Sequence, residues 1–160
     1  MLEIVPADTP SQLATVRELF LEYADSLNFE LNFQSFDRDI NELPGKYAPP
    51  EGRLYLARWD GKVAGCIALK KLGPDTCELK RLWVKPAFRG KKIGRALAER
   101  VIADAREIGY RKMMLDTIDT MIEAMTLYQS LGFEKTVPYY DNPVKGATHF
   151  EKCLTESEDK

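Results

Sequence analysis

The chain has 160 residues, of which 44% are hydrophobic and 30% are charged, and its formal net charge is -2 at pH 7. This length predicts a single domain, and the slightly acidic balance argues against nucleic acid as a partner. No apolar run reaches the roughly 20 residues of a membrane-spanning helix, and the first residues do not form a secretory signal, so we expect no membrane partner.

Cysteine and histidine are scarce, which limits metal and disulfide chemistry. Cys66, Cys77 and Cys153 are odd in number and widely spaced, a pattern that favours free thiols in a reducing compartment and hence a cytoplasmic protein. His149 is the sole histidine, so a histidine-rich metal centre is excluded and no metal site is predicted. A nucleophile paired with histidine would have to use His149, and no residue near it in sequence supports such a pair.

The first half of the chain predicts a strand, a helix and a hairpin. Residues 2–6 alternate as a strand does, and Thr9 to Gln12 is typical of a helix start. Apolar residues then follow at helical spacing: Leu13, Val16, Phe20, Tyr23 and Leu27. Residues 28–50 are irregular, with a short helix expected around 36–43. Residues 53–59 and 62–69 flank Asp60-Gly61, a strong hairpin signal.

The second half predicts alternating strands and helices. A strand at 77–84 extends the hairpin into an antiparallel meander, and a helix at 93–108 ends at Gly109. A strand at 113–117 follows, and this strand–helix–strand order favours parallel pairing. Thr120 and Glu123 form a capping box for a helix that ends at Gly132.

Two last strands are expected at 133–138 and 148–154, before a polar tail at 155–160. These elements predict one α+β domain over residues 1–154, with a mixed sheet and helices on both faces.

The most informative stretch is residues 81–97, an apolar strand that passes through a cationic, glycine-containing turn into an amphipathic helix. Between Lys80 and Arg95 there are seven Lys or Arg residues and no Asp or Glu. The first amides of a helix lack intrahelical partners and carry partial positive charge, so this arrangement is typical of a phosphate site. A solvated basic face is the alternative interpretation.

Two motifs and the order of elements over residues 2–154 resemble the GCN5-related N-acetyltransferase (GNAT) family, which transfers an acyl group from acyl-CoA to an amine. Residues 82–97 are similar to the family's Arg/Gln-x-x-Gly-x-Gly/Ala loop and helix, and residues 127–133 to its LYxxxGF signature. The resemblance implies a mostly antiparallel sheet of about seven strands whose central parallel pair splays apart. It also implies acetyl-CoA or coenzyme A as the cofactor.

The resemblance assigns cofactor contacts to the turn, its flanking strand and helix, and two later residues. These are Leu82, Trp83, Val84, Arg89, Gly90, Lys91, Lys92, Ile93, Gly94, Arg95, Ala96, Thr117 and Tyr128. Two departures bear on this assignment, because Lys92 stands where glycine is usual and Met121 where asparagine is frequent. A positive φ at Lys92 would cost on the order of 1 kcal/mol, whereas helical angles would leave its amide as useful as that of glycine.

The resemblance also implies catalytic roles for Tyr128 and Glu78. Tyr128 would protonate the departing thiolate as general acid; an ordinary half-buried aromatic side chain is the alternative. Glu78 would act as general base through a water, and the alternative is a strand-face carboxylate paired with Lys80 or Arg81. Asp116 is a weaker candidate, and deprotonation of the amine in bulk water needs no base at all.

The sequence says least about which residues bind the acceptor amine. By resemblance it is lined by Tyr23, Phe29, Phe33, Tyr139 and Tyr140. Acids outnumber bases by four to one between residues 30 and 42, which indicates a cationic amine, although these phenylalanines fit a hydrophobic core equally well. We expect a small-molecule amine or a peptide as acceptor, and a monomer or a homodimer.

These observations predict an N-acetyltransferase that uses direct attack in a ternary complex. The alternative is a catalytically silent CoA-binding regulatory module, which Lys92 and Met121 favour and Tyr128 opposes. A phosphate-binding protein of unrelated fold is a third interpretation.

Overall fold

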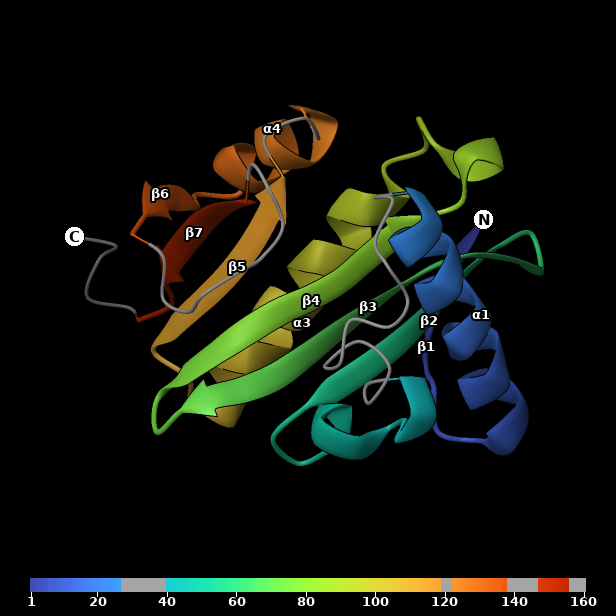
Figure 1. Cartoon of the computed structure of the whole chain (residues 1–160), viewed down its shortest axis with the longest axis horizontal. Coiled ribbons are helices and arrows are strands. Elements are labelled where there is room, and N and C mark those ends of the chain that lie inside the picture. Colours follow the sequence, from blue (N-terminus) through green and yellow to red (C-terminus); the bar gives the residue numbers. More distant parts are fainter. Residues whose placement is uncertain (27–39, 119–121, 138–146, 156–160) are drawn as a thin grey trace.

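The computed structural model describes residues 1–26, 40–118, 122–137 and 147–155 (Figure 1). Its helices and strands follow in the order β1 (Leu2–Pro6), α1 (Pro10–Ser26), η1 (Gly45–Tyr47), β2 (Arg53–Trp59), β3 (Lys62–Gly73), β4 (Thr76–Val84), η2 (Pro86–Phe88), α3 (Ile93–Ile108), β5 (Lys112–Ile118), α4 (Ile122–Ser130), β6 (Glu134–Thr136) and β7 (Ala147–Cys153). Several residues discussed above lie outside the described ranges: Leu27, Phe29, Phe33, Thr120, Met121, Tyr139 and Tyr140.

The strands form one sheet in the order β1-β2-β3-β4-β5-β7-β6. All neighbouring pairs are antiparallel except β4 and β5, which are parallel. The right-handed crossover expected of such a pair is the connection that carries α3. This arrangement confirms the predicted α+β class and the mixed seven-stranded sheet.

Local signals fix several of the element boundaries. Thr9 and Gln12 exchange capping hydrogen bonds, from the Gln12 amide to Thr9 Oγ1 at 3.2 Å and from the Thr9 amide to Gln12 Oε1 at 3.1 Å. Asp60 and Gly61 have φ values of 52° and 83°, as the tight turn of a two-residue hairpin requires. Gly109 ends α3 with φ at 112°, where glycine avoids the steric cost of a side chain.

Two strands differ in length from their predicted ranges. β3 extends past residue 69 to Gly73, because its antiparallel pairing with β4 continues through Lys71 opposite Cys77 and Gly73 opposite Thr76. β6 is only Glu134–Thr136, since it lies at the sheet edge and pairs with β7 alone over this short stretch.

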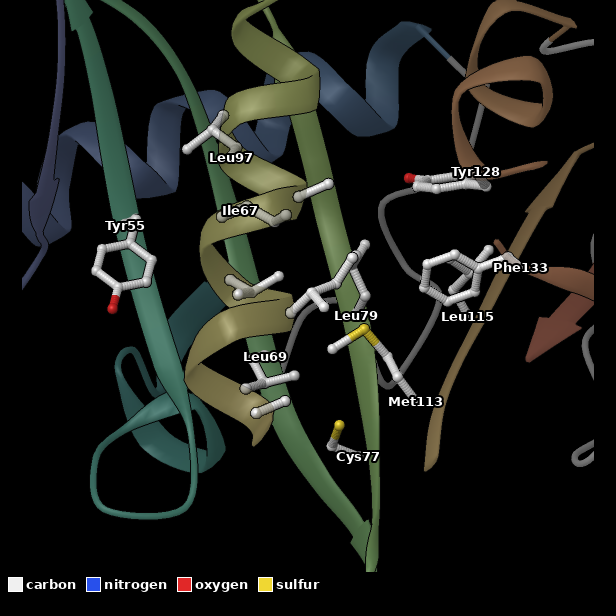
Figure 2. Packing of buried hydrophobic residues seen from close by; sticks show 14 of the residues in the cluster. Tyr55, Ile67, Leu69, Cys77, Leu79, Leu97, Met113, Leu115, Tyr128 and Phe133 are labelled. Atoms are coloured by element: carbon white, nitrogen blue, oxygen red, sulfur yellow. The ribbon is translucent and has the colours of Figure 1, made fainter. Parts of the chain in front are cut away.

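Each face of the sheet is covered by its own hydrophobic cluster. Figure 1 shows α1 on one face and α3 on the other. Residues on β3 alternate between the two clusters, with Ile67 and Leu69 facing α3 while Cys66 and Ala68 face α1. Figure 2 shows how Leu97 of α3 lies over the first of these clusters. The two periods, 2.0 in the strands and 3.6 in the helices, bring these apolar rows together.

Candidate functional site

The parallel strands β4 and β5 pair only at their beginnings. Their partners are Thr76 with Lys112, Cys77 with Met113 and Glu78 with Met114. Beyond this point β4 continues to Val84 and β5 to Ile118 with no further pairing between them. The strands therefore diverge toward the end of the sheet where α4 lies (Figure 1).

A bulge in β4 stands where the two strands separate. Cys66 of β3 lies opposite Trp83, and Ala68 lies opposite Lys80, so Arg81 and Leu82 together face one residue of β3. Arg81 has φ at 58°, in the left-handed region. A bulge of this kind bends its strand and increases the local twist, which turns the end of β4 away from β5.

The turn after β4 leads into α3 with an uncapped helix start. The first intrahelical bond runs from the Ala96 amide to the Lys92 carbonyl at 3.1 Å. The preceding amides, from Lys92 to Arg95, have no intrahelical acceptor, and within the described part of the chain no side chain caps α3. The helix dipole adds partial positive charge at the same place, so these amides suit an anion.

Lys92 adopts left-handed angles, with φ at 63° and ψ at 25°. Of the two possibilities for this position, the strained one is therefore present. The left-handed conformation costs a lysine about 1 kcal/mol relative to its ordinary angles. Gly90, two residues earlier in the same turn, also has positive φ, at 87°, but glycine adopts such angles without this cost.

A cleft of about 850 Å³ opens beside this helix start. It lies between the end of β4, the turn, the first residues of α3, and α4. Its lining is formed by Leu82, Trp83, Val84, Phe88, Arg89, Gly90, Lys92, Ile93, Gly94, Arg95, Ile122, Glu123, Ala124, Thr126, Leu127 and Ser130. Most residues predicted from the motif as cofactor contacts are in this lining, and the described structure thus gathers them around one concave surface.

Four predicted cofactor residues are not in the cleft lining. Lys91 places its ammonium 5.1 Å from the ring centroid of Trp59 on the β2–β3 hairpin. The Ala96 amide donates to the Lys92 carbonyl within α3. Thr117 is buried in β5 opposite Thr148 of β7. Tyr128 is also absent from the lining, although its chain neighbour Leu127 belongs to it.

The sequence motifs missed the wall that α4 contributes to the cleft. The α4 residues of this wall recur at the three- and four-residue intervals of one helix face: Glu123, Thr126, Leu127 and Ser130. Helical periodicity applied to the LYxxxGF block could therefore have found them. Arg95 of α3 donates to Ser130 Oγ at 2.9 Å, which joins the two helices across the cleft.

Tyr128 is buried, with 6% of its surface exposed. Its ring packs edge-on against Phe133 at a centroid distance of 5.8 Å and lies tilted at 6.5 Å from Phe150. In Figure 2 the ring extends from α4 with its hydroxyl directed toward β4. Burial raises the pKa of this phenol above its ordinary value of 10, and the nearby Tyr23 and Asp116 raise it further, so the hydroxyl keeps its proton at neutral pH.

Glu78 lies at the paired beginning of β4, outside the cleft. Its neighbours Cys77 and Leu79 belong to the cluster under α3, so alternation places Glu78 on the α1 face. Its carboxylate lies 3.6 Å from the ammonium of Lys70 and 3.9 Å from that of Lys80. The pairing with Lys80 that the sequence allowed is present, and Lys70 is an additional partner.

The α1 face is tied to the cleft through Trp83. The guanidinium of Arg89 lies 4.8 Å from the Trp83 ring centroid, and Trp83 Nε1 donates to Glu22 Oε1 of α1 at 3.1 Å. Lys85 Nζ lies 2.6 Å from the other oxygen of Glu22. The turn that shapes the cleft therefore contacts the helix on the opposite face of the sheet.

Of the predicted acceptor residues, the structure describes Tyr23 alone. Its ring meets Trp83 edge-on at 6.4 Å, and burial raises its pKa to about 12. Among the described residues, no three His, Cys, Asp or Glu side chains are arranged to hold a metal ion. None of the described helices is long and apolar enough to span a membrane.

A model of the Acetyltransferase (GNAT) family matches residues 13–133. The chain belongs to this family. An uncharacterized N-acetyltransferase of Schizosaccharomyces pombe is 37% identical to this GNAT protein over 150 residues, covering 92% of each chain. The family resemblance inferred from the two motifs is thereby confirmed.

Solved structures show the same fold. An acetyltransferase of the GNAT family from Staphylococcus aureus has a TM-score of 0.82 at 22% identity, covering 97% of this GNAT chain and 100% of that chain. An N-acetyltransferase from Thermoplasma acidophilum, solved in complex with coenzyme A, has a TM-score of 0.73 at 21% identity, covering 96% of this chain and 99% of that one.

Proposed function

We propose that this GNAT protein transfers an acetyl group from acetyl-CoA to a small-molecule or peptide amine. The observation that carries the proposal is the uncapped start of α3, whose amides from Lys92 to Arg95 lie at a cleft beside two diverging strands. The coenzyme A in the related Thermoplasma acidophilum structure supports this donor. The free thiols of Cys66, Cys77 and Cys153 are consistent with a cytoplasmic location.

The chain offers groups that match each part of the donor. The amides at the start of α3 would bind the diphosphate, with positive charge added by Lys92 and Arg89. Among the described residues, no strand pairs with Leu82 or Val84 on the β5 side, and the Val84 carbonyl accepts from Arg89 Nε at 3.0 Å. The remaining main-chain groups can hydrogen-bond an extended, amide-containing arm as a strand would. The apolar side chains of Leu127 and Ile122 would cover that arm.

Acetyl-CoA supplies an activated thioester, so the protein needs mainly to orient the two reactants and manage protons. The amine nitrogen forms a bond to the acetyl carbon while the carbon–sulfur bond breaks. Tyr128 donates its hydroxyl proton to the departing thiolate, and its raised pKa keeps the phenol protonated until the thiolate forms. The main-chain amides of the bulged strand would stabilise negative charge on the carbonyl oxygen.

The incoming ammonium must lose a proton before it attacks. Glu78 and Asp116 both lie on the α1 face. For Asp116 this follows from strand alternation, because its neighbour Leu115 belongs to the cluster under α3. Either carboxylate could receive this proton through water, and direct loss to solvent serves the same purpose. The silent regulatory module remains the second candidate function, because the strained Lys92 departs from the family pattern.

The test combines acetyl-CoA with a panel of amino acids, polyamines and peptide N-termini, and follows both thiol release and the acetylated product by mass spectrometry. For an accepted amine, we expect Tyr128→Phe to lower kcat by about 100-fold with little change in KM for acetyl-CoA. The phenylalanine ring keeps the packing against Phe133, so the variant should fold.

Tyr110→Phe is the matched control. Tyr110 is also buried and donates its hydroxyl to the Glu51 carbonyl at 2.8 Å, but it follows the C-terminal end of α3, a full helix length from the cleft. Its kcat should equal that of the wild type. Tight binding of coenzyme A with no product from any amine would instead support the regulatory module.

A further inference from the structure

We infer that Glu22 of α1 is a positioning residue for the donor, although it is not in the cleft lining. Its carboxylate holds the Trp83 indole in one orientation, and the face of this indole fixes the Arg89 guanidinium at the cleft. This inference rests on the proposed use of acetyl-CoA and names a residue that sets the affinity for it.

Trp83 connects the two faces of the sheet. Its side chain is part of the hydrophobic cluster under α1, and it also lines the cleft beside α3. Figure 1 shows these two helices on opposite faces. A contact that α1 makes with this ring therefore acts on the wall of the cleft.

Arg89 is held against the Trp83 ring within the cleft lining. The central carbon of its guanidinium lies 4.8 Å from the ring centroid, a distance at which an aromatic face attracts a cation. Arg89 Nε donates to the Val84 carbonyl at 3.0 Å. Neither contact is a hydrogen bond from the terminal nitrogens, whose planar arrangement suits a phosphate. The orientation of the indole therefore affects where this cationic group lies.

Glu22 holds the indole by its polar edge. Trp83 Nε1 donates to Glu22 Oε1 at 3.1 Å, and Lys85 Nζ lies 2.6 Å from Glu22 Oε2. Trp83 is only 7% exposed, and a buried indole N–H needs an acceptor. Without the carboxylate, the ring would turn to bring its N–H to water or to another acceptor, and the surface that contacts Arg89 would move with it.

The contacts of Glu22 should matter more for the donor than for the fold. Its side chain is 38% exposed, so solvent screening keeps the contribution of its ion pair to stability small. Both of its partners, by contrast, flank the cleft: Trp83 lines it, and Lys85 begins the turn that leads to Arg89.

The first experiment measures coenzyme A binding to Glu22→Leu and Glu22→Gln by calorimetric titration. Glutamine keeps an oxygen acceptor for Trp83 Nε1, whereas leucine favours helix and has a similar size but offers no acceptor. We expect Kd to rise by about fivefold or more in Glu22→Leu and by less than about twofold in Glu22→Gln.

Two further variants control for folding and for helix surface changes. Glu22→Ala also lacks an acceptor and has the highest helix propensity, so it should repeat the loss seen in Glu22→Leu. Asp25→Leu makes the leucine replacement at an exposed residue of the same helix and should bind coenzyme A as the wild type does. The melting temperatures of all four variants should lie within a few degrees of wild type.

The second experiment tests whether Glu22 acts through the indole on Arg89. Because both residues contact Trp83, their effects on Kd should be non-additive. In an Arg89→Ala protein, the further change Glu22→Leu should raise Kd by less than about twofold. In a Lys92→Ala protein, which keeps Arg89, Glu22→Leu should retain its full effect.

Unchanged coenzyme A binding in a folded Glu22→Leu protein would overturn the positioning role and leave acetyl transfer intact. Equal losses from Glu22→Leu with and without Arg89 would also overturn it, because the effect would not pass through the guanidinium. Absence of binding heat in the wild type would overturn the proposed function itself.

Discussion

Lys92 has an unfavourable backbone conformation at a position that faces the cleft. We expect Lys92→Gly to raise the free energy of unfolding by up to about 1 kcal/mol, because glycine adopts positive φ without steric cost, less the entropy it adds to the unfolded chain. Urea denaturation without cofactor measures this difference.

Lys92→Ala is the control for this prediction. Alanine retains the left-handed strain and removes the charge, so its stability should not rise. Both variants should lose similar affinity for coenzyme A if the ammonium contacts a phosphate, and high salt should shrink that loss. A Lys92→Gly protein less stable than Lys92→Ala would contradict the strain.

The sequence motifs predict which residues lie near the cleft, but not the backbone conformation that each of them adopts. The motif pointed to Gly94, Arg89 and Tyr128; the structure has the first two in the cleft lining, and Tyr128 is not part of it. The φ of Lys92 could not be predicted, because a lysine is compatible with either conformation and the turn around it decides. Lys91 was expected at the cleft, but its contact with Trp59 depends on a hairpin thirty residues away in sequence.

At the scale of elements, β3 holds the bulged end of β4 in place through Gly65. A Cβ at Gly65 would lie 2.4 Å from the Trp83 carbonyl oxygen, so the two strands could not keep their present separation. We expect Gly65→Ala to lower the free energy of unfolding by about 2 kcal/mol and to weaken coenzyme A binding, because the displaced residues line the cleft.

Gly73→Ala provides the comparison on the same strand. Its added Cβ would meet Thr76 Cβ at 3.9 Å, an ordinary contact far from the bulge. Stability and coenzyme A affinity should both stay near wild type. If the two alanine variants behave alike, the close approach of β3 to β4 does not shape the cleft.

The link between α1 and β4 predicts a pH-dependent stability. Burial raises the pKa of Glu22, but hydrogen bonds from Lys85 and Trp83 and the charge of Lys85 outweigh it, so the pKa lies below its ordinary 4.5. A lowered pKa stabilises the fold above pH 4.5, and this contribution is lost as the pH falls through the folded-state value. The glutamate is 38% exposed, so solvent screening limits the contribution to about 0.5 kcal/mol.

Glu22→Gln should therefore be slightly less stable than wild type at pH 7, and the difference should shrink progressively below pH 4.5. Thermal unfolding across this pH range measures it. Asp25→Asn, an exposed change one turn along α1, should show no comparable difference. A constant gap between Glu22→Gln and wild type at all pH values would contradict the ion pair with Lys85.

The elements themselves were largely predictable because their signals are local. Asp60-Gly61, the Thr9 capping box and the helix stop at Gly109 each act within a few residues. The bulge at Arg81 was not predictable from local signals, since it arises from the register between β3 and β4. The short β6 also depends on pairing, because only Glu134–Thr136 has a partner in β7.

At the scale of the whole molecule, the sheet separates the cleft proposed for the donor from the face on which the predicted acceptor residue Tyr23 lies. The cleft and the proposed diphosphate site lie with α3 and α4, whereas Arg81, Glu78 and Tyr23 lie on the α1 face. The strands β4 and β5, which pair only at their beginnings, diverge between these two regions. Family membership was predictable from the combined motifs, but this division depends on how the sheet is assembled.

Every functional step above requires acetyl-CoA to occupy the cleft beside α3, and Gly94 allows a direct test. A Cβ at Gly94 would lie 3.7 Å from Val84 Cγ2 and 3.8 Å from Leu127 Cδ2, so alanine fits there while a leucine side chain would extend into the cleft. Because leucine favours helix more than glycine does, Gly94→Leu should fold with at least wild-type stability.

The measurement is calorimetric titration of coenzyme A into the wild type, Gly94→Ala and Gly94→Leu. The wild type should give saturable heat for one site per chain, Gly94→Ala a moderately weaker site, and Gly94→Leu no binding heat despite an unchanged or higher melting temperature. Absence of saturable heat in the wild type, or equal affinity in the folded Gly94→Leu protein, would show that this cleft is not where the donor binds.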